Sequence, residues 1–278
     1  MRIHPRTAQK IAFALLYLAT GVVALTVVAI VLLMLLKGVP GLSVALFVKG
    51  SQALAPAIVG TLLLVLLTAV LATPVGVMAA VYLSEYARRG PLVRLIRLAI
   101  VNLAGVPSVV YGLFGMALFV MMLKFGRSLL AGSATLALLV LPLVISASEE
   151  ALRQVPQRLR DGSLALGATK WQTVRRVVLP NALPGIITSL ILAVSRAAGE
   201  TAPILFTAAF FSLTDPYPNS VFDKVVALPY RLYAMSTEMP NMPPEQKWAT
   251  ALVLVLLVLG VNAGAIAYRT HLRRKQRW

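Results

Sequence analysis

Long apolar segments alternate with shorter polar ones along the 278 residues of the chain. A helix needs about 20 mostly apolar residues to cross a bilayer, and more when it is tilted. Six segments meet this requirement, and they predict membrane spans at residues 11–36, 56–83, 98–123, 129–147, 184–211 and 248–268. The first follows a short basic leader but is much longer than the apolar core of a signal peptide, about 7–15 residues. We therefore predict that it is retained as a span.

The composition agrees with this pattern. Hydrophobic residues make up 59% of the chain and charged residues 13%, against about 45–50% and about 25% in soluble proteins. This excludes a disordered chain and argues against a soluble enzyme. The predicted fold is an all-α membrane protein with six transmembrane helices, forming a single domain over residues 1–278. Because the chain has no cysteine, and its histidines (His4 and His271) lie in the tails, we expect neither a metal site nor a catalytic centre.

The charges predict how the chain is oriented. The sequence has 26 Lys and Arg residues against 9 Asp and Glu residues. With the N-terminus inside, eighteen basic residues fall on cytoplasmic segments and seven on outer ones. The positive-inside rule therefore favours cytoplasmic N- and C-termini. We interpret the basic run 269–277 as binding anionic lipid and not nucleic acid.

One predicted span contains charged residues. Arg196 and Glu200 lie four residues apart within residues 184–211, and each charge costs at least about 2.5–3.5 kcal/mol at the bilayer centre. One hypothesis is that Arg196 lines a translocation path and offers an anion its guanidinium, with Glu200 holding the arginine in place. The alternative is a self-neutralising pair that faces a neighbouring helix.

Helix-breaking residues interrupt the third and fifth predicted spans. Pro107 with Ser108, and Gly199 with Pro203, predict breaks in these helices, because proline removes a backbone donor and permits a kink. As a set they indicate pathway-lining helices that move, with Ser108 among the candidate pathway residues. Glycine and proline are also simply common in membrane helices, so each one taken alone does not decide the matter.

The outer segment 212–247 is rich in proline. It is predicted to be a docking surface for an extracytoplasmic protein, with residues 228–235 as a short gate, or else a stiff connector. Arg231 is expected to be exposed there, where it either attracts an anion at the outer mouth or is merely solvated.

The segment 149–183 is predicted to be a cytoplasmic loop. Its apolar residues favour short amphipathic helices broken at Gly162 and Gly167, and Pro180 and Pro184 are expected to mark the turn into the fifth span. Such helices suit docking into the groove of a partner. The glycine spacing is that of a phosphate-binding loop, but the Lys-Ser/Thr pair that must follow is missing. ATP binding by this chain is therefore excluded.

This loop resembles the signature loop of ATP-binding-cassette (ABC) importer permeases: Glu-Ala-Ala, three residues, Gly, nine residues, Ile-x-Leu-Pro. The triplet here is Asp-Gly-Ser, and the spacing is intact. The resemblance implies the type I importer permease (MetI-like) fold and a coupling helix that docks on an ATPase. The residues it assigns to this coupling are Asp161, Gly162, Gly167, Ala168, Val177, Leu179 and Pro180.

Four other segments resemble the permeases of phosphate-specific ABC importers, most closely the A-type subunit. They are residues 56–87, 102–115, 195–211 and 228–235. The resemblance implies half of a phosphate pathway in a bacterial plasma (inner) membrane, without covalent chemistry on this chain. ATP and Mg²⁺ are expected on two partner ATPase subunits, and the other expected partners are a sister C-type permease and an extracytoplasmic phosphate-binding protein. The candidate pathway residues are those that the charges, the helix breaks and the outer segment suggested: Arg196, Glu200, Ser108 and Arg231.

Three alternatives remain open at this point. A permease of the same architecture could carry another oxyanion or nutrient. An ion-driven secondary transporter would work alone, although such proteins favour a symmetric repeat and more buried acidic groups than the single Glu200. A sensory or scaffold membrane protein is the third alternative.

Overall fold

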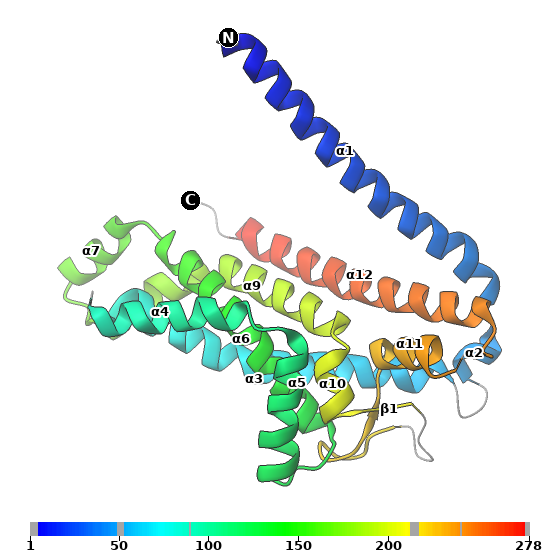
Figure 1. Cartoon of the computed structure of the whole chain (residues 1–278). Helices are drawn as coiled ribbons and strands as arrows, with labels where there is room; N and C mark the ends of the chain where they lie inside the picture. The colour runs from blue at the N-terminus through cyan, green and yellow to red at the C-terminus, as the bar shows by residue number, and fades with distance from the viewer. Residues whose placement is uncertain (1–4, 49–52, 89, 212–216, 240, 276–278) are drawn as a thin grey trace.

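The computed structural model describes residues 5–48, 53–88, 90–211, 217–239 and 241–275, most of which are helical (Figure 1). Along the chain the elements are α1 (Pro5–Gly38), η1 (Val39–Gly41), α2 (Val44–Val48), α3 (Leu54–Val81), η2 (Tyr82–Tyr86), α4 (Pro91–Ala104), α5 (Ser108–Gly115), η3 (Met116–Met122), α6 (Leu129–Arg153), α7 (Gln157–Ala165), α8 (Lys170–Thr173), η4 (Val174–Val178), α9 (Leu179–Gly199), α10 (Ala202–Thr207), β1 (Ala209–Phe210), β2 (Val225–Val226), α11 (Leu228–Thr237) and α12 (Pro244–Lys275). Of the η elements, η1 is a 3₁₀ turn and the other three are π-helical.

Within the described residues, five helices are long and apolar enough to cross a membrane, and a bent helix pair raises the number to six if it counts as one span. The spans predicted at 11–36, 129–147 and 248–268 lie inside α1, α6 and α12, and that at 56–83 lies inside the helix Leu54–Tyr86. The other two predicted spans are not single straight helices. Residues 98–123 belong to a pair bent by 101°, and residues 184–211 cover α10 and only the second part of a helix that begins at Lys170.

The body of the molecule is a bundle in which α3, α6 and α9 pack on one another and α12 packs on α9. Apolar clusters follow one another along its length, from Leu152, Val178 and Ile186 at the end near α7 to Leu64, Leu136 and Ile204 at the end near the strands. We name these the α7 end and the sheet end; Figure 1 shows them at opposite ends of the bundle. Hydrogen bonds between helices, such as Ser148 to Ser189 at 3.1 Å, add to the apolar packing.

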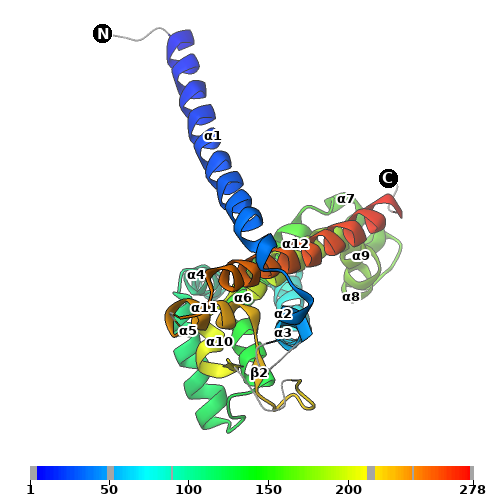
Figure 2. The ribbon, with the colours of Figure 1, turned by 90° about the vertical axis from the view of Figure 1, so that its right-hand side faces the viewer.

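Helix α1 contributes little to this core. It touches α12 at its C-terminal end, where a Cβ on Gly38 would lie 2.9 Å from the carbonyl oxygen of Trp248. From there α1 diverges from the bundle in both views (Figures 1 and 2), and its most apolar stretch is 0% buried. Its apolar surface is therefore left for lipid or another protein.

The sheet end contains the only strands among the described residues. β1 and β2 pair in parallel, with Ala209 opposite Val225 and Phe210 opposite Val226. The following helix, α11, is attached to α3 because the backbone N–H of Leu228 donates to the hydroxyl of Thr61 at 2.9 Å. The predicted all-α class is confirmed apart from this sheet, whose two-residue strands are too short to leave a periodic pattern in the sequence.

Candidate functional site

Arg196 and Glu200 form an ion pair at the point where α9 ends. Helix α9 stops at Gly199, and Glu200 follows it in an extended conformation (φ −75°, ψ 132°). The Nε of Arg196 lies 3.4 Å from the Oε1 of Glu200, with the arginine side chain 40% exposed and the glutamate 18%. The two residues are thus paired although Glu200 has left the helix, and the predicted break near Gly199 is present.

The other predicted break lies between α4 and α5. Gly105 closes α4, and Pro107 has an extended ψ of 141° before Ser108 begins α5. The hydroxyl of Tyr111 donates to the carbonyl oxygen of Leu103 at 2.9 Å and so joins the two sides of the bend. Ser108 is half-buried at the start of α5.

The two interrupted helices meet. A Cβ on Gly112 of α5 would lie 2.9 Å from the carbonyl oxygen of Ala202 and 3.1 Å from the Cα of Pro203, so the backbones of α5 and α10 are nearly in contact. Tyr111 shares an apolar cluster with Ala193 and Ala197 of α9. The Arg196–Glu200 pair therefore lies beside the junction of two broken helices, and breaks of this kind line substrate paths in transporters.

Arg231 does not lie where its position in the sequence suggested. We expected an exposed side chain, but that of Arg231 is 1% exposed and its Nη1 donates to the carbonyl oxygen of Ala53 at 2.8 Å. Its guanidinium also lies 5.6 Å from the ring centroid of Phe211. Burial lowers the pKa of Arg231 to about 10, so the group is still charged at neutral pH. Its contacts indicate an anchor that ties α11 to the start of α3.

The backbone conformation at residue 167 explains why the signature loop has a glycine there. Gly167 has a φ of +81°, and it ends α7 in a Schellman motif in which Gly167 N–H donates to Leu164 O and Ala168 N–H donates to Ser163 O. The next helix starts at once with a capping box between Thr169 and Gln172. Gly162, in contrast, lies inside α7, so the predicted break at this residue is wrong.

The expected turn at Pro180 and Pro184 is also wrong. One helix runs from Lys170 to Gly199 and passes both prolines. It includes a π turn, η4, which ends two residues before Pro180 and in which the Leu179 N–H donates to the carbonyl oxygen of Val174. The wider turn makes room for the ring of Pro180, which clashes with the carbonyl four residues earlier in a regular α-helix. The loop predicted at 149–183 is therefore the end of α6, then α7, a tight turn and the start of this helix.

The coupling residues named by the resemblance lie on α7, on the turn that follows it and on η4 and the start of α9. Asp161, Gly162, Gly167 and Pro180 are exposed, whereas Ala168, Val177 and Leu179 are half-buried. Three large apolar side chains on the same segment are exposed to solvent: Leu164, Trp171 and Leu166, the last at 91%. The exposed tip that they form presents an apolar surface to a partner.

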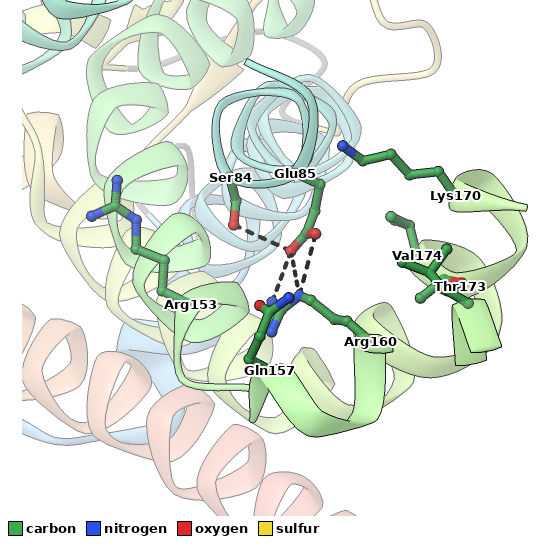
Figure 3. Close-up of a pocket in the computed structure, with 9 residues that line it drawn as sticks. Ser84, Glu85, Arg153, Gln157, Arg160, Lys170, Thr173 and Val174 are labelled. Carbon is green, nitrogen blue, oxygen red and sulfur yellow. Dashed lines mark hydrogen bonds and ion pairs between the residues drawn. The ribbon is translucent and has the colours of Figure 1, made fainter. Parts of the chain in front are cut away.

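A cavity of about 430 Å³ separates α7 and α8 from the end of α3 (Figure 3). On its wall Arg160 forms an ion pair with Glu85, with 2.8 Å between Nη2 and Oε1 and side-chain exposures of 11% and 9%. We predicted no role for either residue from the sequence. The scarcity of acidic residues could have indicated Glu85, because it is one of only nine and directly follows an apolar span.

No group of three or more His, Cys, Asp or Glu side chains that could hold a metal ion occurs among the described residues. His4 lies outside the described part of the chain, as does the side chain of His271.

Comparisons with known proteins agree with this architecture. Residues 72–278 match the family described as "Binding-protein-dependent transport system inner membrane component". The chain is 41% identical to the phosphate transport system permease protein PstA of Mycobacterium leprae (strain TN), over 77% of this chain and 69% of the relative. It is 37% identical to PstA of Yersinia pestis, over 81% and 78% of the two chains.

A solved structure shows the same fold. An inward-facing MetNI methionine ABC transporter chain matches with a TM-score of 0.64 at 18% identity, covering 79% of this chain and 95% of that one. The match confirms the predicted MetI-like permease fold. From the family match and the identities to its relatives, this chain belongs to the inner membrane components of binding-protein-dependent transport systems, the multi-pass permeases of ABC importers.

Proposed function

We propose that this chain is the A-type permease subunit of an ATP-driven phosphate importer and forms half of its translocation pathway. The observation that carries the proposal is the Arg196–Glu200 pair at the junction of two broken helices, in a chain whose relatives are named phosphate transport permeases. A guanidinium suits phosphate because its planar fork donates two hydrogen bonds at once.

The geometry of the pair suits transient binding. Glu200 contacts the Nε of Arg196, which leaves the two Nη groups able to face an anion. The carboxylate also repels a phosphate bound there, so the anion can leave again, as transport requires. Ser108, at the first turn of α5, adds a hydroxyl near the other break. Arg231 is not part of this pathway, because it is buried against Ala53 and Phe211.

The α7 end is proposed to face the cytoplasm and the sheet end the outside. Two partner ATPase subunits bind ATP with Mg²⁺, and one of them docks on the exposed tip formed by Leu164, Leu166 and Trp171. A sister C-type permease supplies the other half of the pathway, and a phosphate-binding protein delivers its ligand at the sheet end. This chain performs no covalent chemistry; it moves between outward-open and inward-open forms.

Replacing Arg196 tests the proposal. In proteoliposomes that hold the whole complex, we expect Arg196→Gln to abolish uptake of labelled phosphate while the ATPase subunits still co-purify, because the anion loses its two-donor contact. Arg196→Lys keeps the charge without the fork, so we expect it to recover only a small part of the uptake. Normal uptake by Arg196→Gln would refute the pathway role.

The substrate is tested by competition in the same vesicles. Excess unlabelled phosphate is expected to suppress the uptake of labelled phosphate, whereas excess sulfate or molybdate leaves it unchanged. Equal suppression by sulfate or molybdate would favour a permease for another oxyanion.

A further inference from the structure

Helix α7 is attached to the bundle by few side chains. None of its residues is buried. Leu159 packs against the apolar cluster at the α7 end, and the Ser163 hydroxyl lies 2.9 Å from that of Thr173 in the next helix. Elsewhere the cavity separates α7 from α3. Leu159 supplies apolar packing of α7 against the cluster at this end, and α7 also packs on η4.

Arg160 makes the polar connection. Its Nε lies 3.3 Å from each carboxylate oxygen of Glu85, and its Nη2 lies 2.8 Å from Oε1. The same Nη2 donates to the carbonyl oxygen of Leu152 at 2.8 Å, and Nη1 donates to that of Val155. One side chain on α7 therefore contacts both the end of α6 and η2, the π turn that ends α3. Figure 3 shows Arg160 and Glu85 pointing at each other across the edge of the cavity.

We propose that Arg160 and Glu85 are positioning residues that transmit the movement of α7 to the membrane spans. The inference rests on the proposed function, in which partner ATPases displace α7. A displacement of α7 pulls on Glu85 and on the Leu152 carbonyl together, and so moves α3 and α6, which pack on each other. A forked guanidinium–carboxylate pair suits this task because it has a fixed geometry. An apolar contact such as that of Leu159 has no directional bond and can slide.

The chain offers a matched control in the same cavity. Arg153 lines its wall and pairs with Glu149 at 2.7 Å, but both residues belong to α6, so this pair does not connect α7 with α3. Arg153→Gln makes the same chemical change as Arg160→Gln without breaking a connection between elements.

The test measures coupling in the whole reconstituted complex as phosphate taken up per ATP hydrolysed. We expect Glu85→Gln, Arg160→Gln and the double variant each to lower this ratio at least tenfold while the ATPase subunits still co-purify. Arg153→Gln is expected to keep the parent ratio. The double variant matters because it leaves no buried charge without its counter-charge, so it separates loss of coupling from poor folding.

A merely structural role predicts a different result. The variants would then yield less complex, but the complex that forms would move phosphate at the parent ratio; that result in the double variant overturns the inference. If the parent complex hydrolyses ATP and takes up no phosphate, the proposed function fails, and the inference fails with it. A parent complex that transports, beside variants that transport equally well, refutes the inference alone.

Discussion

Two glycines five residues apart in the coupling segment have opposite backbone requirements. Gly167 needs its positive φ to close the Schellman motif, whereas Gly162 lies inside α7 in a conformation that any residue adopts. A Cβ at either position would meet no atom within 4 Å. The difference between them is therefore one of backbone conformation and not of space.

Alanine substitutions are expected to separate these two requirements. Gly167→Ala should destabilise the end of α7 by about 1–2 kcal/mol, the cost of a left-handed conformation for a residue with a side chain. Gly162→Ala should stabilise α7 by about 0.5–1 kcal/mol, because glycine loses more conformational freedom in a helix. Hydrogen exchange of the α7 amides would measure both effects. Equal protection in the two variants would show that the backbone at residue 167 does not limit the helix.

At the scale of elements, the close approach of α5 and α10 depends on Gly112. A Cβ there would meet both the side chain of Phe206 and the backbone of Ala202 and Pro203. The side chain of Phe206 can move aside, but the backbone of α10 is held between Glu200 and the strand β1. The two broken helices can therefore pack this closely only because residue 112 is a glycine and has no side chain.

We expect Gly112→Ala to push α5 and α10 apart and to destabilise the chain by about 1–3 kcal/mol, as overpacking of a tight interior does. Thermal unfolding of the purified chain in detergent would show this as a lower melting temperature. Gly260→Ala is the control, because a Cβ on Gly260 of α12 meets nothing within 4 Å. A melting temperature for Gly112→Ala equal to that of the control would contradict the close approach.

For the whole molecule, charge and shape point to the same orientation. The α7 end contains Arg88 and the basic segments 90–97 and 153–176 as well as the exposed apolar tip. The sheet end holds the small sheet and α11. The positive-inside rule predicts that the α7 end faces the cytoplasm and the sheet end the outside.

The absence of cysteine from the sequence makes this orientation directly testable. Leu166→Cys places a thiol at the exposed tip of the α7 end, and Val221→Cys places one at the sheet end, where Val221 is 43% exposed. A membrane-impermeant maleimide should label Val221→Cys in intact spheroplasts and Leu166→Cys only in inverted vesicles without bound ATPase. The reverse pattern of labelling would refute the topology.

Much of the fold was predictable because it depends on local composition. Apolar length identifies a span wherever it lies, and basic residues mark its cytoplasmic side, so residues 129–147 and 248–268 could be placed without any tertiary contact. Pro107 and Gly199 also indicated the breaks correctly, because proline and glycine act on their own backbone. The expectation of a turn at Pro180 was wrong for a related reason. Proline disfavours a regular α-helix locally, but the sequence does not show whether the chain answers with a turn or, as here, with a π turn inside a continuous helix.

The sequence by itself therefore determined the membrane class, the approximate spans, the broken helices and the signature loop, since each depends on neighbouring residues. The tertiary structure decided which distant groups meet. Glu85 and Arg160 are 75 residues apart, Arg231 is buried against residues far from it in the chain, and the two breaks pack together at Gly112. Such contacts follow from how helices pack, and packing depends on the shapes of whole surfaces and not on the pattern within any one segment.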